Sequence, residues 1–256
     1  MKNAVAIVLA AGKGTRMKSE LPKVLTPVAG RPMLEYPLAA LQDAGIEKIL
    51  VVIGYRGEEV QKKMSHWPNL TFVWQTEQKG TGHAVQCCVE TLRKIVPDTE
   101  TPVVIVAGDS PMMQGKTIAA MLENWYAEPT AGLLGTIEVE NPTGLGRILR
   151  DSEGNFLGIV EEKDATPLQK TIREVNQSYY LFRMKDLLEV LPRLRAENAQ
   201  GEYYLTDVPG FLLREGKTVR ALPLLQSIEA TSVNTPEERD RAELLLLEFQ
   251  NRTTNH

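Results

Sequence analysis

Apolar stretches alternate with helical patterns through the first half of the chain. Each apolar stretch is a nearly continuous run of Val, Ile and Leu, which is typical of a strand buried on both faces of a parallel sheet. The predicted strands are residues 4–10, 48–55, 70–75 and 102–109. Between them, apolar side chains recur at helical spacing in residues 32–45, 57–65 and 82–96. This order predicts a βαβαβ progression.

The pattern changes after Glu128, where more extended segments begin. These segments are residues 131–140, 146–163 and 173–184, with a turn predicted at "DSEGN", residues 151–155. Helical patterns return at residues 185–199, 204–216 and 236–249. We therefore expect an antiparallel or mixed extension of the first sheet.

The sequence predicts one α/β domain, residues 1–256, with a Rossmann-like mixed, mostly parallel sheet flanked by helices. We expect residues 1–128 to form a nucleotide-binding half, residues 129–234 a substrate-binding half, and residues 235–256 a C-terminal helix and tail. Neither an internal repeat nor a low-complexity linker interrupts the sequence. Ligands of such sheets gather at the carboxyl ends of the strands, so the candidate site residues are sought there.

Composition narrows the class of protein. The 256 residues are 43% hydrophobic and 24% charged, as in ordinary globular proteins, and no apolar run approaches the roughly 20 residues that span a bilayer. We expect a cytoplasmic protein with no membrane partner. The net charge of −4 argues against a general nucleic-acid surface but permits a local basic pocket. The neighbours Cys87 and Cys88 are expected to be reduced and buried, and the scattered histidines do not predict a zinc site.

A glycine-rich, basic loop follows the first predicted strand, and two common phosphate motifs do not describe it. A Walker A loop requires a glycine five residues before Gly12, where Ile7 stands, and a Ser or Thr after Lys13, where Gly14 stands. A dinucleotide fingerprint requires a third glycine where Met17 stands. Neither a P-loop nor a Rossmann dehydrogenase is predicted.

The same loop suits a polyphosphate. Small residues let the backbone approach a ligand and expose N–H groups that favour an anion. Arg16 and Lys23 add two positive charges, Arg as a fork for phosphate oxygens and Lys as a point charge. The small residues are Ala10, Ala11, Gly12 and Gly14. The alternative is a tight turn with two solvated basic residues.

Two candidate metal ligands have structural alternatives. Asp109 ends a predicted strand, and Mg²⁺ is usually held by one or two protein oxygens together with substrate phosphates. The alternative is that Asp109 caps the helix that begins near Gln114. Asn234, in "NTPEE", by itself predicts a helix N-cap or a turn.

Two further candidates are also ambiguous from the residues alone. The amide of Gln75, close to Gly80 and Thr81, offers both a donor and an acceptor, as recognition of a pyrimidine edge requires. The alternative for residues 80–82 is a plain turn into a helix. Glu161, followed by another glutamate, is by composition a solvated charge.

A family resemblance links these features. The stretch "LAAGKGTRMKSELPKVLTPVAGRPML", residues 9–34, resembles the signature of sugar-1-phosphate nucleotidylyltransferases. The short interval from Arg16 to Lys23 is similar to that of the N-acetylglucosamine-1-phosphate uridylyltransferases. Further matching segments are "QTEQKGTGHAV" (75–85), "AGDSP" (107–111), "NPTGLGRI" (141–148), "GIVEEKDAT" (158–166), "EVN" (174–176), "NAQGEYYLTD" (198–207) and "VNT" (233–235).

The resemblance implies the fold of nucleotide-diphospho-sugar transferases and a magnesium-dependent reaction. UTP and N-acetylglucosamine 1-phosphate would give pyrophosphate and UDP-N-acetylglucosamine, a cell-wall precursor. Arg16 and Lys23 are implied to be catalytic, and Asp109 and Asn234 are implied to hold Mg²⁺. The implied substrate-binding residues are Leu9, Ala10, Ala11, Gly12 and Gly14 for the phosphates, Gln75, Gly80 and Thr81 for uracil, and Gly146, Glu161 and Asn176 for the sugar.

Departures from the family pattern leave the sugar open. Ala107 stands where the family often carries an aromatic residue, and Gln177-Ser178 stand where Thr-Gly often follows Asn176. Another sugar, such as glucose 1-phosphate, and a non-catalytic nucleotide-sugar sensor remain as alternatives. Many family members continue into a trimeric left-handed β-helix acetyltransferase built from hexapeptide repeats. Residues 235–256 contain no such repeat, so acetyl transfer is not predicted, the family's trimer is not assumed, and the chain is either single-function or a piece of a longer protein.

Overall fold

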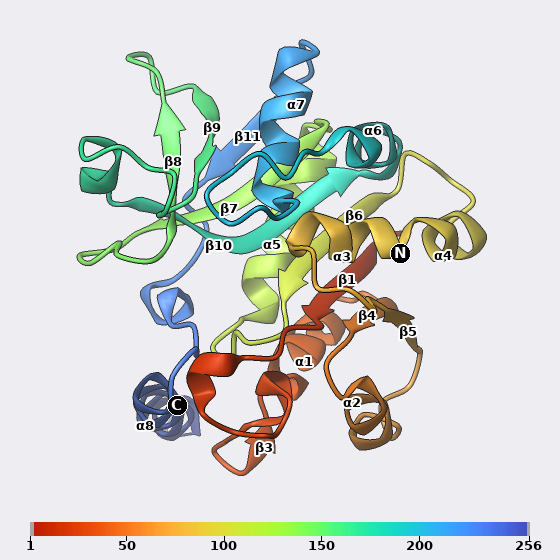
Figure 1. Ribbon diagram of the computed structural model, residues 1–256, viewed down its shortest axis with the longest axis vertical. Helices are drawn as coiled ribbons and strands as arrows, with labels where there is room; N and C mark the ends of the chain where they lie inside the picture. Colours follow the sequence, from red (N-terminus) through yellow and green to blue (C-terminus); the bar gives the residue numbers. More distant parts are fainter. Residues whose placement is uncertain (1–2, 255–256) are drawn as a thin grey trace.

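The computed structural model describes the backbone of residues 3–254 and the side chains of residues 3–249. Within this part of the chain, a central sheet carries helices on both faces (Figure 1). The main path of the sheet follows the order β11-β7-β10-β6-β1-β4-β5. In chain order these strands are β1 (Val5–Ala10), β4 (Lys48–Ile53), β5 (Leu70–Trp74), β6 (Pro102–Ala107), β7 (Gly132–Glu138), β10 (Glu174–Arg183) and β11 (Val219–Leu222).

Strand β10 is the reversed strand of this path in the described residues. It pairs antiparallel with both β6 and β7. The other neighbours on the path pair in parallel: β6 with β1, β1 with β4, β4 with β5, and β7 with β11. The antiparallel hairpin of β8 (Gly146–Arg150) and β9 (Phe156–Val160) joins β10 beside Asn176. The predicted mixed, mostly parallel sheet flanked by helices is confirmed. Strand β11 was not predicted, because its four residues, VRAL, are too few for a pattern.

Strands and helices alternate through the first half of the chain, as predicted. The helices pack on the sheet through two apolar cores, one on each face. Ala6 and Val8 of β1 face one core, whereas Val5 and Ile7 face the other, so the strand is apolar at every position. The first core is covered by α1 (Glu35–Asp43), α2 (Gly57–Lys63) and α5 (Gly115–Ala127). The second is covered by α3 (Thr81–Cys87), α4 (Val89–Ile95), α6 (Met184–Val190) and α7 (Val208–Arg214).

Some sequence expectations differ in detail. The helix expected over residues 185–199 ends at Val190 and continues only as the 3₁₀ turn Leu191–Arg193, where Pro192 removes a backbone donor. Both cysteines are free thiols, but only Cys88 is fully buried. Cys87 is half-buried, so its expected burial is only partial.

A third, smaller apolar cluster ties the two ends of the chain together. Met17, Val28 and Met33 of the N-terminal segment pack with Ala242 and Leu246 of α8 (Pro236–Thr254). The short strands β2 (Pro27–Val28) and β3 (Arg31–Pro32) form a hairpin there, and Figure 1 shows α8 beside it. This contact brings the segment before α8 next to the glycine loop. No helix among residues 3–254 has the length and apolar character needed to cross a membrane.

Candidate active site

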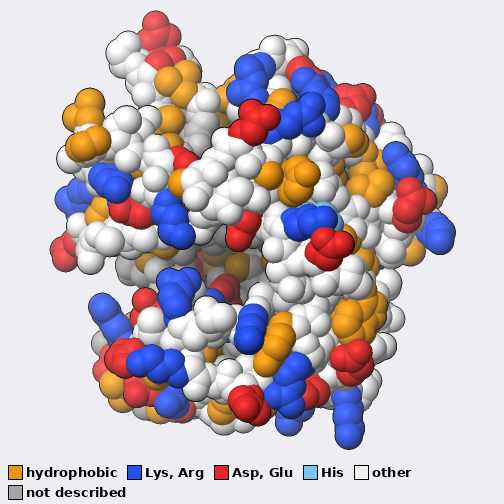
Figure 2. All heavy atoms as spheres, viewed as in Figure 1, with side chains coloured by type: hydrophobic (Ala, Val, Ile, Leu, Met, Phe, Trp, Pro, Cys, Tyr) orange, Lys and Arg blue, Asp and Glu red, His pale blue; other side chains and the backbone are white. Residues whose placement is uncertain are grey.

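The carboxyl ends of the parallel strands meet at one edge of the sheet. The Leu9 carbonyl accepts a hydrogen bond from Gly108 N–H (2.9 Å), and the Ala11 carbonyl accepts one from Tyr55 N–H (3.2 Å). These bonds hold the loops after β1, β4 and β6 against one another. A cavity of about 550 Å³ opens at this edge, and Figure 2 shows the surface hollowed between two halves of the molecule. All five small or apolar residues predicted to bind phosphates line it: Leu9, Ala10, Ala11, Gly12 and Gly14.

Gly14 is the position of this loop that only glycine fits. Its φ of 65° lies in the left-handed region, and a Cβ there would collide with the Cβ of Lys23. The close approach of the Gly14 backbone therefore seats the lysine stem. In the described part of the chain, the N–H groups of Gly12 and Gly14 donate no backbone hydrogen bond. They are available to an anion in the cavity.

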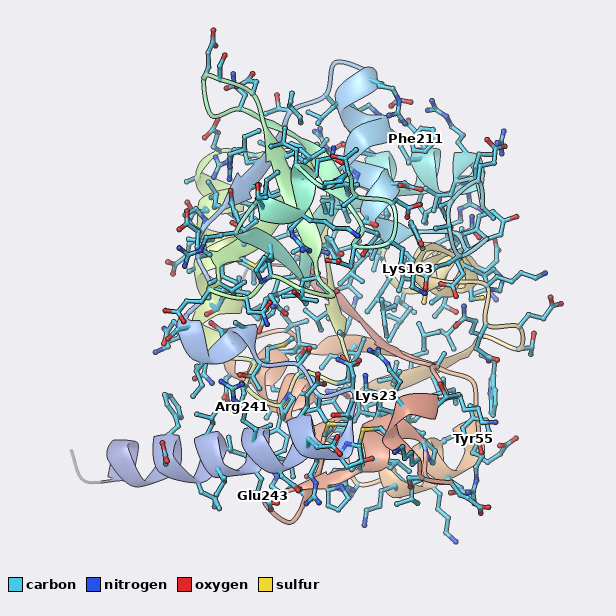
Figure 3. The ribbon with its side chains drawn as sticks, turned by 60° about the vertical axis from the view of Figure 1, so that its left-hand side comes forward. Lys23, Tyr55, Lys163, Phe211, Arg241 and Glu243 are labelled. Atoms are coloured by element: carbon cyan, nitrogen blue, oxygen red, sulfur yellow. The ribbon has the colours of Figure 1, made fainter. Side chains whose placement is uncertain are left out.

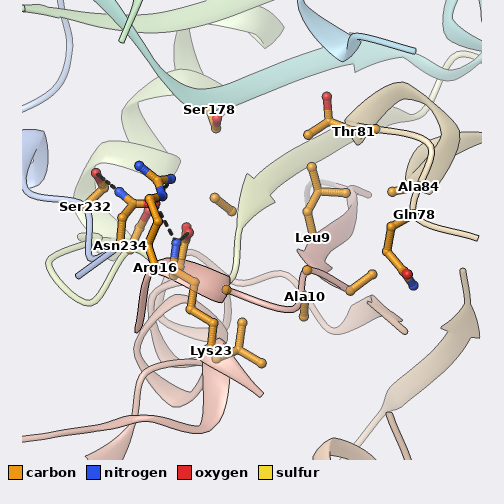
Figure 4. A pocket seen from close by; sticks show the side chains of 18 of the residues that line it. Leu9, Ala10, Arg16, Lys23, Gln78, Thr81, Ala84, Ser178, Ser232 and Asn234 are labelled. Carbon is orange, nitrogen blue, oxygen red and sulfur yellow. Dashed lines mark hydrogen bonds and ion pairs between the residues drawn. The ribbon is translucent and has the colours of Figure 1, made fainter. Parts of the chain in front are cut away.

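Arg16, Lys23, Asp109 and Asn234 converge at one side of the cavity, where Figure 4 shows all but the aspartate labelled. The Lys23 ammonium donates to the Asp109 carboxylate and to Asn234 Oδ1, the latter at 2.7 Å. Arg16 donates to the same amide oxygen at 2.9 Å. The Lys23 side chain is only 12% exposed, and Figure 3 shows it near the beginning of α8. The fold thus brings all four predicted catalytic and metal residues together.

The structural alternatives for Asp109 and Asn234 do not apply. Helix α5 begins at Gly115 after Gln114, and the Asp109 carboxylate is instead engaged by Lys23. The hydroxyl of Thr235, and not the amide of Asn234, accepts the N–H of the third residue of α8, Glu238, at 3.2 Å. The Asn234 side chain is therefore directed to the cavity.

The Asp109 and Asn234 oxygens fit a hard divalent cation. Both contact one cationic atom, the Lys23 Nζ, so they already converge on a single point. Carboxylate and amide oxygens are the ligands that such cations prefer, and the adjoining cavity leaves room for phosphate oxygens to complete the coordination. A cation held by these two oxygens would take the place that the Lys23 ammonium occupies here.

The loop carrying Asn234 is anchored by Glu229, a carboxylate that is 2% exposed and accepts four hydrogen bonds. The donors are the N–H groups of Gln114 (3.0 Å) and Gln226 (2.9 Å) and the hydroxyls of Thr117 (2.6 Å) and Tyr179 (3.0 Å). Three of these donors lie outside the loop, at α5 and on β10. The carboxylate therefore fixes the loop to the body of the domain.

Removing this anchor is expected to destabilise the fold. Glu229→Ala should lower the free energy of unfolding by about 3 kcal/mol, because two buried hydroxyls and two partly buried backbone N–H groups lose their acceptor. Urea denaturation followed by circular dichroism measures the change. Glu229→Gln is the matched control, since it keeps the volume and one acceptor oxygen and should lose less. A Glu229→Ala protein with an unchanged midpoint and slope would contradict the anchoring role.

The predicted uracil residues lie on the opposite side of the cavity. Gln75 is 3% exposed, and its Nε2 donates to the Gly80 carbonyl at 3.0 Å and lies 3.1 Å from His83 Nδ1. The Thr81 hydroxyl accepts the N–H of Leu205 at 3.0 Å. Residues 80–82 do turn into a helix, as the alternative held, and Gln75, Gly80 and Thr81 also line the cavity.

A smaller recess of about 160 Å³ adjoins the main cavity and contains the predicted sugar residues. Gly146 of β8 pairs directly with Asn176 of β10, and Glu161 follows β9. The pKa of Glu161 is raised, because burial disfavours the charged carboxylate more than the 2.9 Å hydrogen bond from the Thr206 hydroxyl favours it. Glu161 is therefore not a solvated surface charge.

The recess also contains two hydroxyls that were not predicted from the sequence, those of Tyr180 and Thr206. Asn176 Nδ2 donates to the Tyr180 oxygen at 2.6 Å, and burial raises the pKa of Tyr180, so the phenol keeps its proton at neutral pH. Tyr180 is indistinguishable from a core residue in the apolar pattern of β10. Thr206 is brought in from a distant segment, so only the tertiary structure reveals either hydroxyl.

The family follows from a comparison with known domains. The family model described as the MobA-like NTP transferase domain matches residues 6–201, which is well over half of the chain. The chain belongs to the MobA-like NTP transferase family. The matched region includes β1, the glycine loop and Gly146, Glu161 and Asn176 of the recess, and it ends shortly before Thr206. The nucleotidyltransferase membership predicted from the sequence motifs is confirmed.

Curated relatives of this MobA-like NTP transferase carry the name bifunctional protein GlmU. The relative from Heliobacterium modesticaldum is 43% identical over 249 residues, which cover 96% of this chain and 52% of the relative. The relatives from Pelobacter propionicus and Lactococcus lactis subsp. cremoris (strain SK11) are 40% and 41% identical, over 95% and 94% of this chain and 51% of each relative. The chain thus spans about half the length of the curated relatives it matches. Both comparisons support nucleotidyltransferase activity.

Proposed function

We propose that this chain transfers the uridylyl group of UTP to N-acetylglucosamine 1-phosphate, releasing pyrophosphate and forming UDP-N-acetylglucosamine. The observation that carries the proposal is that the two cavities adjoin each other and share lining residues. The cluster of Arg16, Lys23, Asp109 and Asn234 lies in the larger cavity, and the polar recess around Glu161 opens beside it. The motif resemblance to N-acetylglucosamine-1-phosphate uridylyltransferases and the identity to GlmU relatives support the same reaction.

The chemistry requires alignment and charge neutralisation more than a strong base. The phosphate of the sugar substrate is already anionic at neutral pH, so its oxygen attacks the α-phosphorus of UTP directly. The bond from the α-phosphorus to the bridging oxygen breaks, and pyrophosphate leaves with the electron pair. Arg16 and Lys23 stabilise the charge on the transferring group and on the departing pyrophosphate. Asp109 and Asn234 would hold Mg²⁺, which supplies further neutralisation of the phosphates when bound.

The geometry of Gln75 suits uracil. Its Nε2 is engaged by Gly80 and by the ring of His83, so Oε1 is the atom left to face a base. A carbonyl oxygen opposite N3 accepts the N3–H of uracil, whereas cytosine has no hydrogen on N3 and could donate only from its exocyclic amino group. An Oε1 that faces N3 therefore supports UTP.

The recess supports a sugar with several hydrogen-bonding groups. Glu161 accepts from hydroxyls, Asn176 offers an amide, and Gly146 leaves room for the ring. A Cβ at Gly146 would stand 3.5 Å from Glu161 Oε2 and 3.1 Å from Ile159 Cγ2, so any other residue would crowd the recess. A neutral hexosamine is recognised chiefly through such polar contacts.

A pyrophosphate-release assay over a grid of substrates tests the proposed function. UTP and CTP are each combined with N-acetylglucosamine 1-phosphate and with glucose 1-phosphate, with Mg²⁺ or with EDTA. The expected result is release from UTP with N-acetylglucosamine 1-phosphate, abolished by EDTA and restored by excess Mg²⁺. Release restricted to glucose 1-phosphate would instead identify the alternative sugar. Silence in every well, together with binding of the nucleotide sugar, would identify a sensor.

A further inference from the structure

Ser178 has a backbone conformation that serine rarely adopts in a strand. Its φ of 58° lies in the left-handed region, where a side chain costs about 1–2 kcal/mol. The other described non-glycine residues with positive φ lie in loops or turns, namely Lys18, Ala29, Arg56 and Asn69. Ser178 alone among them lies inside a strand, β10. A strained position within regular structure is a reason to look for function there.

The strain comes from a bulge in β10. Asn176 pairs with Thr136 of β7 and Tyr179 pairs with Gly135, so two residues of β10 are left without a partner in β7. The first of them, Gln177, is buried and donates to the Ala230 carbonyl at 3.2 Å. The second, Ser178, donates its N–H to Asn176 Oδ1 at 3.2 Å. Both bonds hold the bulge in one shape.

The bulge places the Ser178 side chain at the neck between the two cavities. Ser178 lines the large cavity that contains Lys23 and also the recess that contains Glu161. Figure 4 shows Ser178 above the cluster that contains Arg16 and Lys23. The serine side chain is also a hydrogen-bond partner of the buried Tyr180 phenol, which lines the recess. Ser178 therefore connects the polar lining of the recess with the cluster of Arg16, Lys23, Asp109 and Asn234.

A sugar 1-phosphate that occupies both the recess and the large cavity would place the link between its ring and its phosphate at this neck. With the ring in the recess and the phosphate turned to Arg16 and Lys23, the C1–O–P linkage lies between them. The lining shared by the two cavities includes the apolar side chains of Leu9 and Leu145. A hydroxyl next to a phosphate in such a place makes a charge-assisted hydrogen bond.

We propose that the Ser178 hydroxyl donates a hydrogen bond to the phosphate of the bound sugar 1-phosphate and orients the attacking oxygen. This inference rests on the proposed function, because it assigns the neck to the acceptor substrate. It gives the bulge a purpose: the left-handed backbone at Ser178 places this serine in the lining of both cavities, where ring and phosphate would meet. Ser178 is thus a further substrate-contacting residue of the site.

Two substitutions separate the hydroxyl from the strain. Ser178→Ala keeps the Cβ and the left-handed backbone but removes the hydroxyl. Ser178→Gly removes the hydroxyl and also relieves the strain. If the hydroxyl contacts the phosphate, both variants should raise the KM for N-acetylglucosamine 1-phosphate about tenfold while the KM for UTP changes less than about twofold. Only the glycine variant should have a higher melting temperature than the wild type.

Free N-acetylglucosamine, which lacks the phosphate, provides the internal control. Its inhibition constant as a competitor of the sugar 1-phosphate should be the same for wild type and Ser178→Ala. A Ser178→Ala enzyme with a normal KM for the sugar phosphate would overturn the inference, as would an equal rise in both substrate KM values. Failure of the proposed function would be distinct, since the wild-type enzyme would then not release pyrophosphate from these substrates at all.

Discussion

Lys23→Ala is expected to reduce the turnover of pyrophosphate release at least about a hundredfold, the typical loss of one electrostatic contact to a transition state. Lys23 Nζ contacts the oxygens of Asp109 and Asn234, and its stem lies against Gly14. Three segments of the chain, those that carry Gly14, Asp109 and Asn234, therefore hold the lysine side chain in place beside the cavity. Steady-state kinetics with UTP and N-acetylglucosamine 1-phosphate measure the loss, and circular dichroism checks that the fold is retained.

The same loop offers a matched control for this charge. Lys13 is exposed and lies 5.2 Å from the centre of the Tyr55 ring, outside the lining of the cavity. Lys13→Ala removes the same charge from the same loop and should change turnover less than about threefold. Near-normal pyrophosphate release by Lys23→Ala, or an equal loss in both variants, would remove the assigned role of Lys23.

A second measurement on Lys23→Ala needs no turnover. In the protein without ligands, the lysine ammonium stands between the Asp109 and Asn234 oxygens that would hold a divalent cation. Removing it eliminates a competing positive charge. Titration with Mn²⁺ followed by electron paramagnetic resonance should therefore give binding at least as tight as in the wild type, although the enzyme is slower. Weaker Mn²⁺ binding would contradict this arrangement.

Asp109→Ala is expected to lower turnover by a similar factor, at least about a hundredfold, for a different reason. It removes the charged member of the proposed cation site, whereas the neutral amide oxygen of Asn234 remains. Mn²⁺ binding without substrate should be lost, in contrast to Lys23→Ala. Asp109 is partly exposed at the cavity, so its removal leaves Lys23 accessible to water and the fold is expected to persist.

Matched variants test whether Asp109 acts through a cation. Asp109→Asn keeps an oxygen ligand without the charge, so raised Mg²⁺ should restore part of its activity but little of that of Asp109→Ala. Asn234→Ala should add much less in the Asp109→Ala background than in the wild type, because both side chains serve one ion. An Asp109→Ala enzyme whose Mg²⁺ dependence matches the wild type would exclude the metal role.

Local features explain why much of the fold was predictable. The runs at β1 and β6, and residues 49–53 of β4, are apolar at every position because each is buried on two faces, and this pattern is visible without a structure. The glycine loop is equally local, since Gly14 and Lys23 are close in the sequence as well as in space. The bulge in β10 left only a weak signal, the polar pair Gln177 and Ser178 within an apolar strand.

By itself, the sequence determined the alternating α/β architecture and the nucleotidyltransferase family, and it predicted phosphate binding by the loop around Arg16. Those conclusions depend on residue type and short spacing, which a linear chain displays directly. Only the tertiary structure decided that Asn234 meets Lys23 across 211 positions, and that Tyr180 and Thr206 share a recess with Glu161. Such contacts arise from the packing of distant segments, through the small apolar cluster under α8 and the buried anchor Glu229. No short-range pattern encodes where those segments meet.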